Sequence, residues 1–171
     1  MIALFTTPGA ALIHNGQEYG EDYWLPASGA GRVEPRPLHW EFLDETPGQQ
    51  LLALHQKLIQ MRKAHPALRS HNFYPRHYDE RMTGFNDQGY GVDESRDIVI
   101  YHRWGTTEEG QLERFIIVLN FSDYDQHVNV PFSSNGVWQD LLNAGEYFVD
   151  NYHLANQLIN SNWGKVFYRK E

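Results

Sequence analysis

The chain has 171 residues, of which 41% are hydrophobic and 14% aromatic, a composition typical of a globular protein rather than a disordered one. Its formal net charge of −8 argues against nucleic acid as a partner, because such binding needs clustered Lys and Arg. Cysteine is absent, which excludes disulfides and thiolate metal sites. No apolar run reaches the ~18 residues of a membrane span, so no membrane partner is expected.

The first predicted element is a strand over residues 10–13. This short apolar run lies between a Pro8-Gly9 break and an Asn15-Gly16 turn signal, and a polar, acidic loop follows. A strand that ends in a Gly-containing acidic loop is how a (β/α) barrel builds its active face. We therefore expect a barrel strand without its neighbours. In the isolated chain this segment should be either disordered or re-routed, or buried in a dimer through its open edges.

A helix is predicted over residues 46–66. Thr46 suits the N-cap, Pro47 suits the first helical position, and Pro66 ends the helix. Apolar residues recur at steps of three and four and form one stripe: Leu51, Leu54, Leu58 and Met61. Such a stripe indicates a helix packed against other parts of the protein.

The remaining residues, 72–171, predict β-structure. Short strands are expected at 98–101, 115–119, 137–142 and 165–169, with a long exposed loop over 79–96. Val128, Val130 and Phe132 alternate with polar residues, as in a strand with one buried face. Turn signals separate these runs, which together indicate an antiparallel β-sandwich.

Four segments carry recognisable motifs in chain order. They are Pro8-Gly-x-x-x-Ile-His-Asn-Gly-Gln-Glu18, Arg36-Pro-Leu-His-Trp40, the helix 51–68 with its Arg-Lys-Ala-His-Pro-Ala-Leu ending, and Arg114-Phe-Ile-Ile-Val-Leu-Asn-Phe-Ser122. They resemble, respectively, the eighth-strand motif, the Arg-x-Pro-Met-x-Trp loop, the last barrel helix and a strand of the following all-β domain in the α-amylase family of glycoside hydrolases.

This resemblance implies a mainly β fold with two parts. Residues 1–70 would be the C-terminal end of a (β/α)8 catalytic barrel, with its last strand, a loop and its last helix. Residues 71–171 would be the antiparallel β-sandwich domain. A complete TIM barrel takes roughly 250 residues, so the chain is too short to contain one.

The carboxylates of the first part are the candidates for catalytic groups. Glycoside hydrolysis usually needs two carboxylates that face each other across the bond, and the residues available are Glu18, Glu21, Asp22 and Glu41. In the family, the resemblance implies that the catalytic carboxylates come from strands four, five and seven, and none of those motifs occurs here. No catalytic residue is therefore assigned, and the chain alone is predicted to be inactive.

Substrate contact is predicted for residues near the first loop. Flat aromatic rings beside hydrogen-bonding side chains are the chemistry that binds sugars. The resemblance implies that the candidates line the rim of the site in an intact enzyme: His14, Asn15, Gln17, Glu18, Trp24, Arg36 and Trp40. The structural alternative is that Trp24 and Trp40 only pack within the loop. His14 stands where the family commonly has Tyr, which leaves specificity open.

Other sites receive weaker support. The nine histidines match no metal-binding spacing, and no phosphate-binding loop occurs, so no metal and no cofactor are expected. Trp104, Trp138 and Trp163 would form a sugar-binding platform if exposed and coplanar, but packing in the sandwich is favoured.

Two functions follow. The first is the C-terminal portion of an α-glucan-active hydrolase or transglycosidase of carbohydrate metabolism, whose partners would be starch-like α-glucan or maltooligosaccharide and the missing barrel part of the same polypeptide. The alternative is a free-standing carbohydrate-binding β-sandwich module. The barrel-like segment 1–45 favours the first, because a binding module has no use for a barrel strand.

Overall fold

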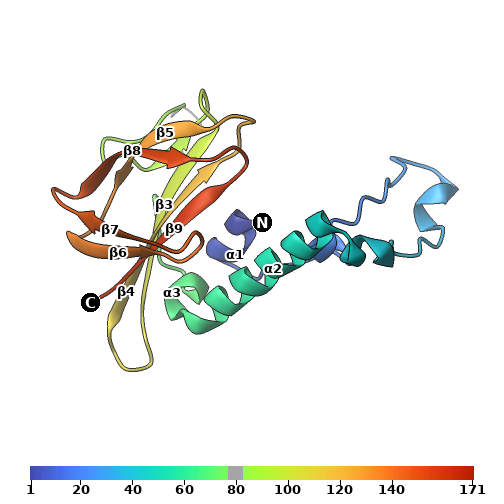
Figure 1. The fold of residues 1–171 in the computed structure, drawn as a ribbon, viewed down its shortest axis with the longest axis horizontal. Coiled ribbons are helices and arrows are strands. Elements are labelled where there is room, and N and C mark those ends of the chain that lie inside the picture. Colours follow the sequence, from blue (N-terminus) through green and yellow to red (C-terminus); the bar gives the residue numbers. More distant parts are fainter. Residues whose placement is uncertain (77–82) are drawn as a thin grey trace. The chain divides into compact units, whose positions relative to one another are not determined.

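The computed structural model describes residues 1–76 and 83–171. Contacts divide the chain into two compact units, one of residues 1–10 and 61–171 and the other of residues 11–60. The first unit contains the β-rich part of the protein (Figure 1). This division differs from the boundary predicted between residues 70 and 71, because residues 1–10 and 61–70 group with the β-structure.

The described helices are α1 (Ile2–Thr6), α2 (Thr46–Ala64) and α3 (Pro66–Arg69), with short 3-10 helices η1 (Gln17–Tyr19), η2 (Ala30–Val33) and η3 (Trp40–Asp44). The helix predicted over 46–66 is confirmed as α2. It ends before Pro66, which instead opens α3, where a missing N–H group is tolerated. Within the predicted apolar stripe, Leu58 and Met61 are buried, whereas Leu51 and Leu54 are half-buried. No described helix is long and apolar enough to cross a membrane.

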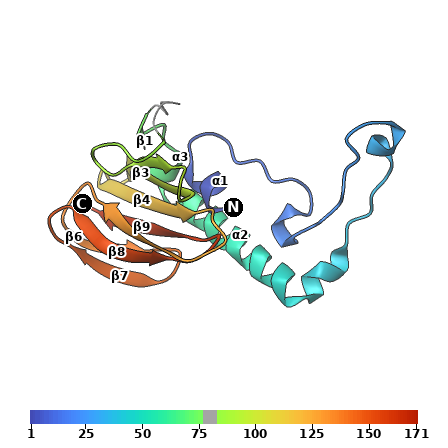
Figure 2. The same cartoon turned by 90° about the horizontal axis from the view of Figure 1, so that it is seen from above.

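The described strands form two antiparallel sheets, which confirms the predicted β-sandwich. They are β1 (Phe73–Tyr74), β2 (Gly91–Asp93), β3 (Ile98–Thr106), β4 (Leu112–Asn120), β5 (Gln126–Pro131), β6 (Gly136–Asp140), β7 (Gly145–Val149), β8 (His153–Ile159) and β9 (Gly164–Lys170). The large sheet has the order β1-β3-β4-β9-β6-β7, with β2 also paired to β3, and the small sheet pairs β5 with β8. Figure 2 shows β3, β4 and β9 side by side.

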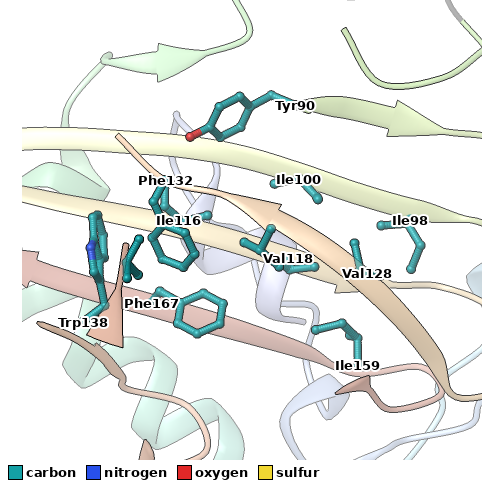
Figure 3. Packing of buried hydrophobic residues seen from close by; sticks show 12 residues of the cluster. Tyr90, Ile98, Ile100, Ile116, Val118, Val128, Phe132, Trp138, Ile159 and Phe167 are labelled. Atoms are coloured by element: carbon teal, nitrogen blue, oxygen red, sulfur yellow. The ribbon is translucent and has the colours of Figure 1, made fainter. Parts of the chain in front are cut away.

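The core lies between the two sheets (Figure 3). The large sheet contributes Ile98, Ile100, Ile116, Val118, Trp138 and Phe167, and Val128, Val130 and Phe132 come from β5 and the residue that follows it. The alternation predicted for Val128 and Val130 is thus confirmed, with the exposed Asn129 between them. Trp138 is fully buried and its indole N–H donates to the Ser134 carbonyl at 3.1 Å, so the predicted packing role is confirmed for this tryptophan.

The other face of the large sheet is covered by helices rather than by a second sheet. α3 packs on β3, and Gly105 leaves room for it: a Cβ there would lie 2.7 Å from the Cα of Ala67. The Glu113 carboxylate accepts the N–H of Ala67 at 2.6 Å and approaches Nδ1 of His65 at 2.8 Å. This buried carboxylate therefore satisfies a backbone donor in the first turn of α3, which a helix cannot satisfy itself.

A buried arginine joins three chain segments on this face. Arg103 of β3 is fully buried, and its guanidinium donates to the carbonyls of Ala67 at 3.0 Å, Ser70 at 2.6 Å and Asn72 at 2.7 Å. It also donates to the carbonyl of Thr6 in α1. A second arginine, Arg62, donates to the carbonyls of Phe5 at 2.8 Å and Thr7 at 3.0 Å. These contacts explain why the first ten residues group with the sandwich.

Two predicted features differ in the structure. The strand expected over residues 10–13 is wrong: these residues have no regular structure, and Leu12 is 83% exposed. A strand needs a neighbour to satisfy its backbone groups, and residues 10–13 pair with no strand in the described parts of the chain. For the loop expected over 79–96, residues 79–82 lie outside the described chain. Within the rest, Tyr90 is buried and β2 forms, because it pairs with the edge of β3.

Candidate functional site

The first part of the site is a tight turn in the unit of residues 11–60. The backbone N–H of His14 donates to Oε1 of Gln17 at 3.0 Å, and the His14 ring approaches the Asn15 carbonyl at 3.2 Å. Gly16 has φ of +87°, and a Cβ there would lie 2.6 Å from Cβ of Glu21. Glycine is required at this position for both reasons. The turn thus brings together three of the predicted residues, His14, Asn15 and Gln17, and places Gly16 against the Glu21 side chain.

A carboxylate–histidine contact joins this loop to the segment around η3. Oε2 of Glu21 accepts the backbone N–H of His39 at 2.7 Å, and Oε1 lies 2.7 Å from the ring Nδ1 of the same residue. The Glu21 side chain is only 4% exposed. Both carboxylate oxygens are therefore engaged in holding two loops 18 residues apart in sequence.

The contact shifts the pKa of both partners. Burial alone would raise the pKa of Glu21, but the hydrogen bonds from the His39 backbone and ring outweigh it and hold the pKa below its usual range. The hydrogen bond to Glu21 raises the pKa of His39, against a smaller opposing effect of burial. The pair is thus an ion pair when the imidazole is protonated.

Aromatic rings surround this contact. The ring centroids of Tyr19 and Trp40 lie 5.8 Å apart, and His39 lies between Tyr23, at 4.9 Å, and Phe42, at 5.1 Å. The Tyr19 hydroxyl is buried and has no hydrogen-bond partner among the described residues. Trp40 nevertheless stays 62% exposed, so one part of its ring surface is open to a ligand.

The other predicted residues take different places. Trp24 is 78% exposed, and Glu18 is half-buried in η1. Arg36 donates to the carbonyls of Arg32 at 3.3 Å and Glu34 at 3.2 Å, which makes it an organiser of its own loop. The predicted substrate contacts of these residues remain predictions, since the geometry alone does not assign a ligand to them.

Asp22 completes a small cluster that no sequence pattern indicated. Its Oδ1 lies 3.6 Å from Nδ1 of His39, and ligand atoms of Glu21, Asp22 and His39 lie within 4.8 Å of one another. Three such side chains are also the kind that hold a cation. Here the hydrogen bonds between Glu21 and His39 are enough to explain why the groups lie close together. The sequence shows no metal-ligand spacing here, because His39 lies far along the chain from Glu21 and Asp22.

Comparisons with known proteins agree with this architecture. No protein-family model matches the chain. Over 160 residues the chain is 28% identical to the 1,4-alpha-glucan branching enzyme GlgB of Marinobacter nauticus, and the match covers 91% of this chain and 22% of that enzyme. The crystal structure of an Anoxybacillus alpha-amylase superposes with a TM-score of 0.60 at 16% identity, covering 98% of this chain and 30% of that one. Ttha1563 from Thermus thermophilus gives a TM-score of 0.60 at 18% identity, with 99% and 30% coverage.

A long helix followed by an antiparallel sandwich is a fold that the chain shares, over almost its whole length, with these two solved structures. These matches support the interpretation of the chain as a C-terminal part of an α-amylase family enzyme. The resemblance inferred from four motifs is thereby confirmed. The chain spans no more than 30% of the length of any of these three relatives.

Proposed function

We propose that the chain is the C-terminal portion of an α-glucan-active hydrolase or transglycosidase, in which it has a structural and substrate-supporting role. The observation that carries this proposal is the match to the branching enzyme, which runs through both compact units rather than through the sandwich alone. An independent binding module would require similarity only over the sandwich. Residues 1–70 would then be the end of the catalytic barrel.

We further propose that the chain has no glycosidase activity by itself. Of the candidate carboxylates, Glu21 and Asp22 both face His39, so the imidazole lies where a glycosidic bond would have to be. A retaining pair needs about 5–5.5 Å of free space between its carboxyl groups. Glu21 is instead held by two hydrogen bonds, which suits a brace for the loop.

The substrate-supporting role would belong to the exposed rings and polar groups of residues 11–60. Trp24 and Trp40 offer open ring faces, and the turn at His14 offers hydrogen-bonding groups nearby in sequence. An α-glucan chain is the ligand we propose for them, because stacking and hydroxyl contacts suit a neutral polyhydroxylated molecule.

The activity proposal is tested by assaying the purified chain on amylose and maltoheptaose, with reducing-end release and iodine staining as measurements. No turnover is expected. A Glu21→Gln variant, made in the same host, is the matched control for contaminating amylase. Turnover by the original chain that is lost in Glu21→Gln would overturn the proposed inactivity and would make Glu21 catalytic.

A further inference from the structure

A pocket opens on the sandwich itself, within the unit of residues 1–10 and 61–171. Side chains alternate between the two faces of a strand, and the face of β3 that buries Ile98 and Ile100 continues with His102 and Trp104. Strand pairing places Tyr74 of β1 opposite His102 and Arg114 of β4 opposite Trp104. The inner face of the large sheet thus changes from aliphatic to aromatic and polar toward the C-terminal end of β3.

These four side chains line a pocket of about 520 Å³. Its other walls include Tyr90, which precedes β2, Ser133, which follows β5, and Tyr152, which precedes β8. Figure 3 shows the Tyr90 ring directed toward Phe132, and both residues line the pocket. The volume falls within the range of about 300–1,000 Å³ typical of small-molecule sites.

The chemistry of the pocket is aromatic and close to neutral. The His102 and Trp104 rings lie 4.9 Å apart, and Nε2 of His102 lies 3.3 Å from the Ser133 hydroxyl. Burial, helped by the positive charge of Arg114, lowers the pKa of His102 to about 4, so this imidazole is neutral at pH 7. Glu171 pairs with Arg114, with Nε and Oε2 at 3.2 Å, and its other carboxylate oxygen lies 3.3 Å from Nε of Arg169. Among the described lining residues, Arg114 is thus the one charged at pH 7 and it already has a carboxylate partner, which favours a neutral ligand.

We propose that this end of the sandwich is a binding site for a neutral sugar ring. The ring would pack against Trp104 and the 59% exposed Tyr152, while His102, Ser133 and the tyrosine hydroxyls would bind its hydroxyl groups. Aromatic faces beside a few convergent hydrogen-bonding groups are the features that such a ligand needs. That the sugar belongs to an α-glucan chain rests on the proposed function.

The site is separate from the candidate site described above. Its lining residues all belong to the unit of residues 1–10 and 61–171, whereas Trp24, Trp40 and the Glu21–His39 contact belong to residues 11–60. No residue belongs to both sites, so a substitution in one removes no lining residue of the other and the two can be compared directly.

The test is calorimetric titration of the full chain with maltoheptaose, and with cellohexaose as a β-linked probe. Trp104→Ala and Tyr152→Ala are each expected to weaken maltoheptaose binding by at least roughly tenfold, the change that corresponds to about 1.4 kcal/mol. Tyr124→Ala is the matched control for Tyr152→Ala, because Tyr124 is equally exposed, at 61%, but does not line the pocket. Trp24→Ala reports on the candidate site of residues 11–60: loss of maltoheptaose binding in Trp24→Ala but not in Tyr152→Ala would place the saccharide in that site and overturn the proposed pocket.

Three outcomes decide the question. The proposed site is wrong if the chain binds neither saccharide, or if the affinity in Tyr152→Ala equals that in Tyr124→Ala. Because Tyr152 is at the surface, its variant remains informative even where Trp104→Ala does not fold. Tighter binding of cellohexaose than of maltoheptaose, lost in Tyr152→Ala, would support the pocket and count against the α-glucan part of the proposed function.

Discussion

Arg103 holds the helical face of the sandwich, and its replacement by methionine is expected to destabilise the protein. Methionine keeps much of the aliphatic volume but removes the guanidinium, which donates to the carbonyls of Thr6, Ala67, Ser70 and Asn72. Burial lowers the pKa of Arg103 to about 10, so the group is still charged at pH 7. The variant therefore loses charge-assisted hydrogen bonds and leaves buried carbonyls without donors.

The magnitude follows from those contacts. A hydrogen bond to a charged group contributes about 1.5–3 kcal/mol, so the three bonds with distances of 2.6–3.0 Å give at least ~4.5 kcal/mol. Removing a buried charge also removes its desolvation cost, which offsets part of this loss. We expect Arg103→Met to lower the free energy of unfolding by roughly 3 kcal/mol.

Urea unfolding followed by tryptophan fluorescence measures this difference by linear extrapolation. Arg32→Met is the control, because Arg32 is exposed and donates to a single carbonyl, that of Ala27, at 3.2 Å. Its effect should stay within about 0.5 kcal/mol. Hydrogen exchange should also show faster exchange at α1 in Arg103→Met. An unfolding free energy for Arg103→Met equal to that of the control would refute this reasoning.

Three further predictions concern the remaining contacts. Glu113→Gln should lower the unfolding free energy by about 2 kcal/mol, because the amide group cannot accept from both Ala67 and the neighbouring ring as the carboxylate does; an unchanged urea midpoint would contradict this. Trp138→Ala should cost ~3–5 kcal/mol as a large core truncation, and a loss below ~1 kcal/mol in the same assay would argue against its central place. The Glu21–His39 contact should stabilise its loops fully only between the ordinary pKa values of the two groups, 4.5 and 6.5. Its contribution is lost above that window as pH rises through the raised pKa of His39, and below it as pH falls through the lowered pKa of Glu21. An NMR titration that places the His39 pKa at or below 6.5 would disprove this.

The sandwich was predictable because its strands carry local signals. The runs at Ile98 and Phe115 and the alternation around Val128 report burial on one face, which depends only on neighbouring residues. The segment 10–13 carried an equally apolar signal but forms no strand. A strand also requires a partner, and the presence of a partner cannot be read from the run itself.

The features of the two sites also differ in whether local sequence predicts them. The turn at His14 and the exposed Trp24 could be proposed from residue types and a resemblance to a family. The Glu21–His39 contact and the pocket around Trp104 each combine residues from segments that are far apart in sequence. A local pattern alone therefore does not predict them. Even so, His102 and Trp104 follow Ile98 and Ile100 at a spacing of two, and this change from aliphatic to aromatic residues is a signal that strand alternation could have used.

Arg103 donates hydrogen bonds to the segments around Thr6 and Ser70 at their backbone alone. Every acceptor is a main-chain oxygen. The hydrogen bonds donated by Arg103 therefore do not depend on which side chains stand at Thr6, Ser70 and Asn72. The side chains of these three residues make separate hydrogen bonds to β3, at the Tyr101 hydroxyl and the Trp104 carbonyl. A substitution at one of these positions therefore costs that side chain's own contact with β3, while Arg103 still fixes the path of the backbone over the sheet.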